Sequence, residues 1–502
     1  MLQLCCSVRI FPLQYYGKGL KWFADMHYAY GGIVMQTRLF HGFRALFAGC
    51  FAAAMAAILL QNGACIALAV LLLCVWACAK WRLPYVTVWL FFGALLVRVA
   101  AVTVVTPPIV SDFRTLYEAA LQLNAGDLSY LKDSYFLLWA YQNAFVIWEA
   151  FWLRLWNDPL FLKLISCLLS AGTVCLVYRI ARGWFRPAAA RMAVVLAALC
   201  PFSVLLPTVL TNQIASAFFL MLGVWLLVCS DCARLRVFRF PLAGLALACG
   251  NILRPEGIIV LTGILAWAVF AVLEDKARWK RILCGLLAVL AVYFAAGGAA
   301  DAALRASGLS PNGLENGNPL WKFVVGLNID TGGSYSPDDQ DKILSTMTDT
   351  GITEQTVAAE KELIRERLSA SPAELLRLFL SKIRVQWCDS ALHWMFGPTT
   401  GEPAYQLYKL TAANLCTQFD RAWFYAAVGL ALFGMAGGRR RADELLPALV
   451  VFAAFCAFLL IEAQARYAYL PQLFILLAAA SGLDRLGKEK ENAQNLDRRP
   501  LL

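Results

Sequence analysis

The chain of 502 residues is 60% hydrophobic and 15% charged, whereas charged residues make up roughly 25% of an average soluble domain. Its apolar residues form long blocks, and a membrane-spanning helix needs about 20 of them, so this composition excludes an ordinary soluble protein. The sequence therefore predicts an all-α polytopic membrane protein. The net charge of +11 is explained by the loop pattern described below and gives no reason to expect nucleic-acid binding.

Taken in chain order, the apolar blocks predict about twelve transmembrane helices. The leading segment 1–44 has neither the length nor the pattern of a span or of a signal peptide, and we expect translation to begin at Met35. The spans are expected near residues 45–60, 63–79, 86–106, 159–180, 189–208, 213–230, 238–252, 256–273, 281–299, 421–437, 445–462 and 468–484.

Lysine and arginine residues set the orientation, because short cytoplasmic loops are enriched in them. With a cytoplasmic N-terminus, every basic cluster falls inside, and the opposite short connections hold only Arg254 and Arg466. We therefore predict a multi-pass protein of the cell (plasma or inner) membrane with both termini in the cytoplasm. The inner clusters are residues 80–82, 179–191, 234–239, 276–281, 439–441 and the tail 485–499.

Two long segments, residues 107–158 and 300–420, then lie outside the cell and have room for a functional site. In the first segment, Ser111 is the candidate N-cap of a helix that ends at Gly126. A second helix, expected over residues 135–156, is aromatic and apolar but interrupted by polar residues. This pattern favours a helix that lies in the membrane interface.

The second outer segment predicts a small domain. It contains a charged helix near residues 354–369 and an amphipathic helix near 371–388 that is opened by "SPAE". The expected organisation is a cytoplasmic segment 1–44, an accessory transmembrane hairpin 45–84, a core 85–299, the extracytoplasmic domain 300–420, the last spans 421–484 and a cytoplasmic tail 485–502.

Asp112 follows the third span directly, at the expected boundary between membrane and water. One interpretation is a helix N-terminal carboxylate that interacts favourably with the helix dipole. The other is a general base at the outer leaflet that takes a proton from an attacking hydroxyl. The local sequence alone leaves both interpretations open.

Glu462 and Arg466 flank the outer end of the eleventh span in "IEAQARYAYLP". Their i, i+4 spacing, with Glu first, is the favourable order for a helical ion pair, which is a purely structural interpretation. Charges near the membrane are costly and often functional, and an arginine is suited to bidentate recognition of a phosphate. Arg254, in "NILRPEG", and Lys382 are further candidates for phosphate binding on the same face. Arg98 lies inside the third span, where it snorkels or pairs with an acid.

Cysteine and histidine residues give little sign of a metal or redox site. Most of the 16 cysteines lie in apolar blocks, where cysteine behaves as a small hydrophobe. Cys229 and Cys232 form a CxxC, but no second pair accompanies them. With only three histidines, we expect no histidine-rich metal centre.

Several short motifs resemble those of the membrane-embedded GT-C glycosyltransferases. They are, in order, "SDF", "LYEAA", "YQNAF", "NILRPEG", "FVVGLNIDTGGSYSPDD", "KIRVQWCD" and "EAQARYAYLP". Each is loose, but their order and their common placement on the outer face are similar to glycosyltransferase family 39, which includes protein O-mannosyltransferases and the lipid A aminoarabinose transferase. The resemblance covers roughly residues 85 to 485. The two spans before residue 85 depart from the simplest core of this family.

The resemblance implies an outer-face enzyme that takes a sugar, mannose-like or another hexose or aminosugar, from a polyprenyl-phosphate carrier. The acceptor is a glycan, a lipid or a protein. In such families the acid of the first outer loop acts as base or acceptor ligand, which maps to Asp112. Protein mannosyltransferases have two adjacent acids there, whereas here Phe113 takes the second position. No cofactor is firmly expected, and a need for a divalent cation stays open because the family varies in metal use.

Chemical reasoning assigns provisional roles to the other candidates. The departing phosphate develops charge that cations must stabilise, and Arg466, Arg254 and Lys382 are expected to hold it. The residues that we expect to contact substrate are Tyr117, Tyr141, Gln142, Asn328, Glu462 and Tyr467.

Two other functions compete with this interpretation. A transporter or flippase often has about twelve spans, but transporters tend to have related halves and mid-membrane charges, and no matching halves are visible here. A polymerase or ligase of lipid-linked glycans differs in the acceptor more than in the mechanism. The concentration of polar residues on one face favours an enzyme that acts on one leaflet.

Overall fold

Helices account for the regular secondary structure in the part of the chain that the structure describes, apart from one isolated bridge between Thr348 and Gly351. The computed structural model describes residues 85–228, 238–348, 351–396, 403–436 and 441–497, which belong to one compact unit. The predicted all-α class is confirmed. The predictions for residues 1–84, including the first two spans and Met35, and for Cys229 and Cys232 concern positions outside the described residues.

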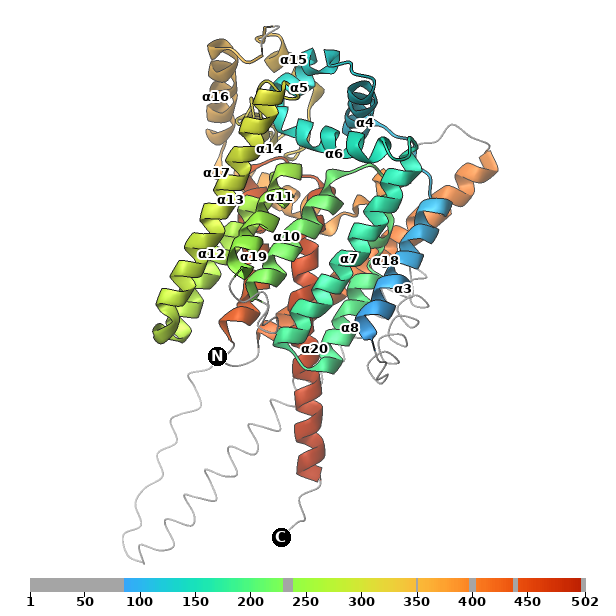
Figure 1. The fold of residues 1–502 in the computed structure, drawn as a ribbon, viewed down its shortest axis with the longest axis vertical. Coiled ribbons are helices and arrows are strands. Elements are labelled where there is room, and N and C mark those ends of the chain that lie inside the picture. The colour runs from blue at the N-terminus through green and yellow to red at the C-terminus, as the bar shows by residue number, and fades with distance from the viewer. Residues whose placement is uncertain (1–84, 229–237, 349–350, 397–402, 437–440, 498–502) are drawn as a thin grey trace, which may run out of the picture. The chain divides into compact units, whose positions relative to one another are not determined.

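Every predicted span within the described residues corresponds to a helix (Figure 1). Among the described residues, five helices are long and apolar enough to cross a membrane, or six if the bent pair α8 (Pro187–Ala198) and α9 (Pro201–Leu205) forms one span. The number twelve therefore stays a prediction. The helices are α3 (Val86–Val104), α7 (Pro159–Trp184), α8 (Pro187–Ala198), α9 (Pro201–Leu205), α10 (Asn212–Val228), α11 (Arg239–Leu253), α12 (Gly257–Glu274), α13 (Trp279–Ser307), α18 (Pro403–Met435), α19 (Ala442–Leu460) and α20 (Tyr469–Asp497).

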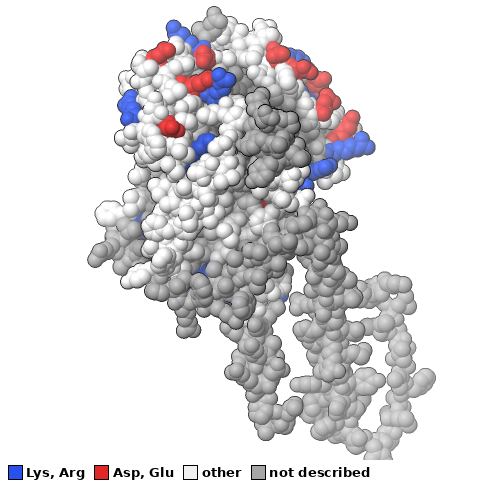
Figure 2. Space-filling model, turned by 90° about the vertical axis from the view of Figure 1, so that its right-hand side faces the viewer, with Lys and Arg blue, Asp and Glu red and all other residues white. Residues whose placement is uncertain are grey.

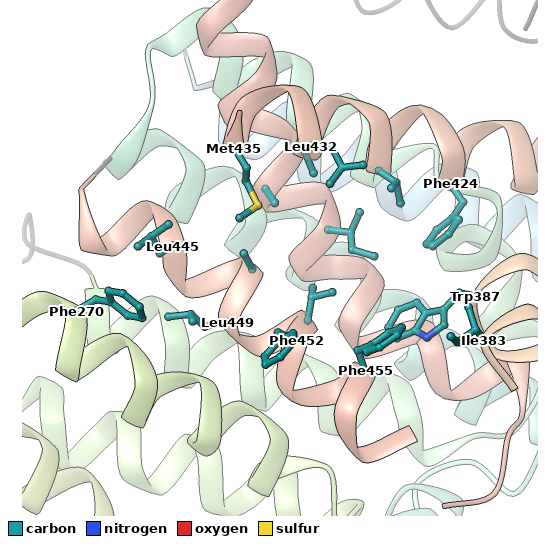
Figure 3. Close-up of a pocket in the computed structure, with 16 residues that line it drawn as sticks. Phe270, Ile383, Trp387, Phe424, Leu432, Met435, Leu445, Leu449, Phe452 and Phe455 are labelled. Atoms are coloured by element: carbon teal, nitrogen blue, oxygen red, sulfur yellow. The ribbon is translucent and has the colours of Figure 1, made fainter. Parts of the chain in front are cut away.

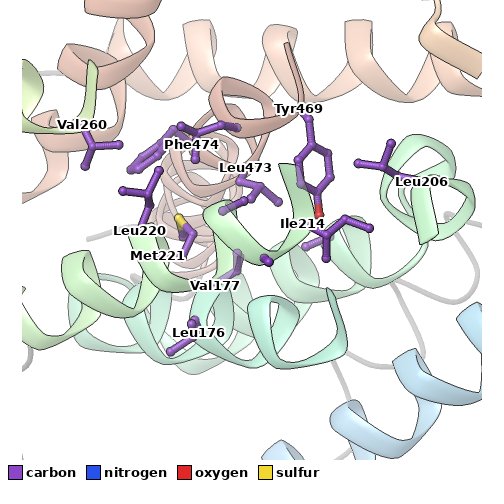
Figure 4. Close-up of a cluster of buried hydrophobic side chains, with 14 of the residues drawn as sticks. Leu176, Val177, Leu206, Ile214, Leu220, Met221, Val260, Tyr469, Leu473 and Phe474 are labelled. Carbon is purple, nitrogen blue, oxygen red and sulfur yellow. The ribbon is translucent and has the colours of Figure 1, made fainter. Parts of the chain in front are cut away.

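The core of the bundle forms around α20. Side chains of α20 such as Leu473 and Phe474 lie among residues of α7 and α10, including Val177 and Met221 (Figure 4). Small residues bring neighbouring helices close together, as is common in membrane bundles. A Cβ atom added at Gly244 of α11 would lie 2.4 Å from the carbonyl oxygen of Val289 in α13. Close packing of this kind fixes how the helix ends are placed.

Arg98 explains how the predicted span 189–208 can be broken. The segment splits into α8 and α9, which are bent by 52°. The fully buried Arg98 guanidinium donates to the carbonyl oxygen of Ala198 at 3.1 Å, to Ser203 Oγ at 2.9 Å and to Ser170 Oγ at 2.7 Å. A broken helix is tolerated at membrane depth only if its freed backbone groups find such partners. Arg98 is therefore fully buried among these acceptors and does not snorkel, and it makes no ion pair with any described residue.

The first outer segment forms short helices instead of the two that the sequence predicted. They are α4 (Ser111–Asn124), η1 (Ser129–Lys132), α5 (Ser134–Leu138), η2 (Ala140–Gln142) and α6 (Asn143–Leu153). Gly126, with φ of +80°, follows the end of α4 as expected, but Ser111 is the first helical residue and makes no side-chain cap. The predicted continuous helix over 135–156 is wrong. Trp139 leaves helical geometry and packs on the outer domain, and the backbone N–H of Tyr141 donates to the carbonyl oxygen of Glu315 instead of to a helical partner.

The second outer segment contains both helices that the sequence predicted. Thr353 and Ser371 each cap a helix with a reciprocal capping box, which satisfies N–H groups that lack helical partners. The amphipathic helix ends at Ile383 and continues as a single π-helical turn. The elements are α14 (Trp321–Gly326), α15 (Pro337–Leu344), α16 (Glu354–Leu368), α17 (Pro372–Ile383), η6 (Arg384–Cys388) and η7 (Ala391–Trp394).

The two outer segments lie together at one end of the helix bundle (Figure 1). Figure 2 shows acidic and basic side chains gathered over this end, while the wall beneath it is largely uncharged. The loops that join α7 to α8 and α12 to α13, which carry predicted inner clusters, lie at the opposite end. This separation of the two kinds of segment agrees with the predicted topology; the side of the membrane that each end faces stays a prediction.

Candidate active site

Asp112 and Arg466, which are 354 positions apart in the sequence, meet at the outer-segment end of the bundle. Arg466 Nη2 donates to Asp112 Oδ2 at 3.2 Å. Arg466 lies in the short helix η8 (Ala465–Ala468), whose position is fixed by a 2.6 Å hydrogen bond from Gln213 Nε2 to the Arg466 carbonyl oxygen. The rings of Phe113 and Trp394 lie 5.3 and 4.9 Å from the guanidinium carbon. These contacts place a carboxylate and a guanidinium in one site.

The two partners of this ion pair differ in exposure. The Arg466 side chain is 10% exposed, whereas that of Asp112 is 42% exposed. Arg466 is therefore held among rings and protein polar groups, and Asp112 is open to water or to a ligand. A cation that is largely desolvated interacts more strongly with an anion than one on an open surface.

Glu462 does not pair with Arg466, so the structural interpretation of their i, i+4 spacing does not hold. Helix α19 ends at Leu460, and residues 461–464 are not helical. The i, i+4 spacing therefore does not bring the two side chains to the same helix face, and each has a different partner. Glu462 Oε2 instead binds the ammonium of Lys322, a residue of α14 in the outer domain. The Tyr467 hydroxyl donates to the same carboxylate oxygen at 2.9 Å.

Lys322 and Glu462 form a charged pair that is strongly coupled to Tyr467. Burial by itself lowers the pKa of Lys322, but the nearby Tyr467 and Glu462 oxygens raise it well above its ordinary value. Burial likewise raises the pKa of Glu462, yet Lys322 holds it below the ordinary value. Both groups are therefore charged at neutral pH. The result is a fixed positive and a fixed negative charge beside the Asp112–Arg466 pair.

Gln464 connects the two ion pairs. Its Nε2 donates to Glu462 Oε1 at 2.6 Å, and its Oε1 accepts a hydrogen bond from Arg466 Nε at 2.6 Å. Its backbone N–H donates to Gln386 Oε1 at 3.1 Å. One amide therefore uses its acceptor and its donor to hold both charged groups at set positions.

Arg254 contributes a third cation to the same cluster. It is paired with Glu256, and its Nη1 donates to Asn212 Oδ1 at 3.0 Å. The Tyr467 ring lies 5.2 Å from the Arg254 guanidinium carbon. The same ring lies 5.7 Å from Lys322 Nζ and from the Arg466 guanidinium carbon. Tyr467 is thus the centre of a site with three cations, as the negative face of an aromatic ring allows.

Hydrogen bonds extend this cluster into the first outer segment. Asn212 donates to Gln142 Oε1 at 3.2 Å, and Gln142 donates to the hydroxyl of Tyr135 at 3.2 Å. Burial raises the pKa of Tyr135 and of Tyr141, and both groups respond to the charge of Asp112, so they lie near it as neutral phenols. Two predicted residues, Tyr141 and Gln142, are therefore part of the site.

Three predicted residues are engaged elsewhere. The Lys382 ammonium donates to the carbonyl oxygens of Gly326 and Leu459, each at 2.7 Å, and is buried, so it ties α14 to the end of α19. Asn328 donates to Asp339 Oδ2 at 2.8 Å and accepts hydrogen bonds from the loop that follows it. Tyr117 packs on the bundle core on the side of α4 that faces α6. We leave these three out of the candidate site.

Sequence reasoning missed Lys322, Gln464 and Asn212. Gln464 lies in the motif "EAQARYAYLP", two residues from Glu462 and two residues from Arg466. This position between two charged candidates could have marked it as a member of the site. Lys322 stands alone in an aromatic helix of the outer domain, where nothing local distinguishes it from a surface lysine. Only the close approach of α14 to the end of α19 brings it to Glu462.

An apolar groove of about 750 Å³ runs along the bundle between α12, α18, α19 and α20 (Figure 3). Phe452 and Phe455 of α19 and Phe424 of α18 lie along it, and Trp387 lies at one end. Aromatic contacts connect that end to the candidate site: the ring centroids of Trp387 and Phe458 are 6.1 Å apart, and those of Phe458 and Tyr467 are 6.4 Å apart. The groove therefore leads from the wall of the bundle toward the three cations.

No group of three or more histidine, cysteine, aspartate or glutamate side chains among the described residues has metal-binding geometry. A divalent cation consequently has no assigned ligands, and the arrangement supplies positive charge through side chains. The chemistry that these residues support is binding of an anion near a carboxylate that can accept a proton.

Comparisons with known proteins agree with the family resemblance. Residues 150–297 match the family model described as dolichyl-phosphate-mannose-protein mannosyltransferase. No curated protein is significantly similar to the sequence. One similar solved structure is the archaeal oligosaccharyltransferase AglB from Archaeoglobus fulgidus in complex with an inhibitory peptide and a dolichol-phosphate, with 15% identity over 82% of this chain and a TM-score of 0.46. Another is the oligosaccharyltransferase of the same organism in the apo form, with 15% identity over 83% of this chain and a TM-score of 0.46.

The chain spans about half of those structures, 52% of each. The stretch matched by the family model runs from α6 into α13 and includes Arg254, but neither Asp112 nor Arg466, whose roles are argued from geometry alone. The family match confirms the resemblance to the membrane-embedded GT-C glycosyltransferases that the sequence motifs indicated, over residues 150–297.

Proposed function

We propose that this protein is an integral membrane glycosyltransferase that moves a sugar from a polyprenyl-phosphate carrier to an acceptor hydroxyl at the outer face of the membrane. The observation that carries this proposal is the contact between Asp112 and Arg466 beside two further cations. The family match and the apolar helices support a membrane enzyme that uses a lipid-linked donor. The concentration of these charged groups at one end of the bundle favours an enzyme that acts on one leaflet over a transporter.

In the proposed reaction, the acceptor oxygen forms a bond to the anomeric carbon while the bond from that carbon to the phosphate oxygen breaks. The electron pair of the broken bond goes to the phosphate, and the proton of the acceptor hydroxyl goes to Asp112. General base catalysis of this kind contributes roughly 10²- to 10⁴-fold to a rate. Arg466, with Arg254 and Lys322 nearby, stabilises the charge that develops on the phosphate.

Binding of the phosphate also releases the base. Arg466 Nε is occupied by Gln464, and Nη2 is occupied by Asp112. The pair of N–H groups that avoids Nε lies on Nη1 and Nη2, directly beside the Nη2 N–H group that Asp112 accepts. Because a phosphate bound there repels the neighbouring carboxylate, the phosphate displaces Asp112 from Arg466 in this proposal, and the carboxylate becomes available to the acceptor hydroxyl.

The groove between α18 and α19 accommodates the isoprenoid tail of the carrier in this proposal. Its walls are almost entirely apolar, and transfer of apolar surface out of water stabilises such binding by roughly 25 cal/mol per Å². The Trp387 end of the groove points toward Tyr467, so a tail in the groove would place its phosphate near the cations.

The experiment that tests the function compares cell-surface glycans by mass spectrometry in cells with and without the gene. Loss of a glycan modification on deletion is expected, with recovery by the wild-type gene but not by Asp112→Asn at equal membrane expression. Asp133 is an exposed acid of the same outer segment, and its side chain makes no ion pair with a described residue. Asp133→Asn is therefore the matched control and is expected to restore the modification. An unchanged glycan profile on deletion, or full recovery by Asp112→Asn, would refute the proposed role.

A further inference from the structure

A second large cavity lies at the end of the bundle opposite the candidate active site. It has a volume of about 730 Å³ and is enclosed by the last residues of α7, α10 and α12 and the first residues of α11, α13 and α19. Figure 1 shows these helix ends far from α4, α5 and α15. The cavity therefore belongs to neither the proposed carrier groove nor the cation cluster around Tyr467.

Arginine side chains from separate segments converge on this cavity. Arg278 and Arg281 come from the start of the α13 region, Arg239 from α11 and Arg441 from the residue before α19. Arg281 is exposed and makes no ion pair with any described residue. Two of these arginines are paired with acids that also line the cavity, Arg278 with Asp275 and Arg441 with Asp443. The four guanidinium groups and the three carboxylates of the lining leave one net positive charge, which attracts an anion.

The three acids that also line the cavity are already occupied by protein groups. Asp275 accepts the Ala277 N–H at 3.0 Å and pairs with Arg278 at 2.8 Å. Asp443 accepts from the Trp267 indole at 3.2 Å, and Glu274 accepts from the Ala442 N–H at 2.8 Å. Because these acids hold the turns and helix ends in place, they do not cancel the charge of Arg281.

The outer walls of the cavity continue onto surfaces that face away from the bundle and are apolar. Leu273 of α12 and Leu283 and Leu287 of α13 are exposed, with exposed fractions from 44% to 65%. In a membrane protein, exposed apolar side chains on spanning helices contact acyl chains. Trp184 and Trp267 line the cavity itself, and tryptophan favours the level of the lipid head groups.

We propose that this cavity binds the head group of an anionic membrane phospholipid, with the phosphate at Arg278 and Arg281 and the acyl chains along α12 and α13. Basic pockets between spanning helices are suited to acidic head groups. The continuous path from a charged cavity to an apolar outer wall fits a molecule with a phosphate at one end and two chains at the other. A soluble phosphate compound would use only the first part of this surface. This inference does not depend on the proposed glycosyl transfer.

The test is native mass spectrometry of the purified, delipidated full-length protein, titrated with phosphatidylglycerol or with phosphatidylcholine of the same chain length. The wild-type protein should retain phosphatidylglycerol about fivefold more strongly than phosphatidylcholine, as expected for about one effective cation near the head group. Arg281→Gln breaks no ion pair with a described residue, so it should fold normally and reduce retention about fivefold. Arg377→Gln, which removes an exposed arginine of α17 in the outer domain, is the matched control and should behave as wild type.

Excess inorganic phosphate, added as a competitor, distinguishes a lipid from a soluble anion. Retention of phosphatidylglycerol in its presence supports a lipid site, and its displacement would overturn the proposal in favour of a soluble phosphate ligand. Equal retention of the two lipids by the wild type, or unchanged retention by Arg281→Gln, would also overturn it. Because the readout is bound lipid, none of these outcomes depends on whether the protein transfers a sugar.

Discussion

Replacing Asp112 by asparagine is expected to abolish sugar transfer and, at the same time, to tighten binding of the carrier phosphate. The amide cannot accept the acceptor proton as a base, so transfer stops. It also carries no charge, so Arg466 Nη2 is no longer held by a carboxylate when the phosphate arrives. A gain in affinity that the Asp133→Asn control does not share therefore indicates competition for the guanidinium.

The size of the gain follows from the geometry of the pair. Two unit charges 4 Å apart interact by about 4 kcal/mol at an effective dielectric constant of about 20, and exposed ion pairs contribute about 0.2–1 kcal/mol when measured. The Asp112 side chain is 42% exposed and that of Arg466 is 10% exposed, so the pair lies between an open surface and an interior. We expect about 1 kcal/mol, which corresponds to a Kd about fivefold lower.

The assay is isothermal titration of the detergent-solubilised protein with a short-chain polyprenyl phosphate. Asp133→Asn provides the control, because it removes one negative charge from the same outer segment without touching Arg466. An affinity gain of similar size in both variants would show a general electrostatic effect, and an unchanged or weaker affinity in Asp112→Asn would refute the exchange. If Arg466→Ala also left the affinity unchanged, the phosphate site itself would be misplaced.

Three further substitutions test the structure around the site. Glu462→Gln leaves Lys322, whose side chain is 33% exposed, without its charged partner. Thermal unfolding should therefore show a loss of about 2 kcal/mol, most of which the double substitution with Lys322→Met should recover. Burial lowers the pKa of Lys382 to about 8, whereas its ordinary pKa is about 10.4. Between these two pH values the unfolded chain binds more protons than the folded protein, so the free energy of unfolding rises with pH by about 3 kcal/mol and Tm rises with it. Lys382→Met should remove this rise, and an identical pH profile of Tm in the variant would contradict the buried cation. Gly326→Ala places a Cβ atom against the Leu460 carbonyl oxygen and should lower the free energy of unfolding by about 2 kcal/mol. Gly297→Ala is the control: no atom lies within 4 Å of its added Cβ, so the same unfolding measurement should show no change or a slight stabilisation.

Elements with strong local signals could be predicted from the sequence. The spans near α7 and α12 are predictable because each contains an apolar run long enough to cross a membrane. The helices after Thr353 and Ser371 are predictable because these capping residues accept hydrogen bonds from backbone N–H groups of the first helical turn. Trp139 shows where this reasoning fails. Its neighbours have the composition of one long helix, but packing of Trp139 on the outer domain breaks the chain there, and tertiary contacts override local preference.

The candidate site was predictable only in part, for the same physical reason. Arg466 stands out because the short outer connections hold only two basic residues, and Asp112 stands out because it follows a span directly. A common face makes contact between them possible, but the fold is needed to bring them together. The i, i+4 rule failed for Glu462 because it presumes a continuous helix, and α19 ends at Leu460. The true partner, Lys322, comes from a domain whose docking on the bundle depends on backbone contact at Gly326, which no local pattern encodes.

The three ion pairs around Tyr467 are unequal, and this inequality determines which cation can accept a ligand. Glu256 and Glu462 are buried beside Arg254 and Lys322, so giving up either pair to a phosphate would strand a carboxylate away from water, which costs several kcal/mol. Asp112 alone is half exposed and can return to water when it is displaced. Two pairs therefore maintain a fixed field and the third exchanges, which leaves one uncompensated positive charge. That charge matches the single negative charge of a phosphodiester that links a sugar to a lipid carrier.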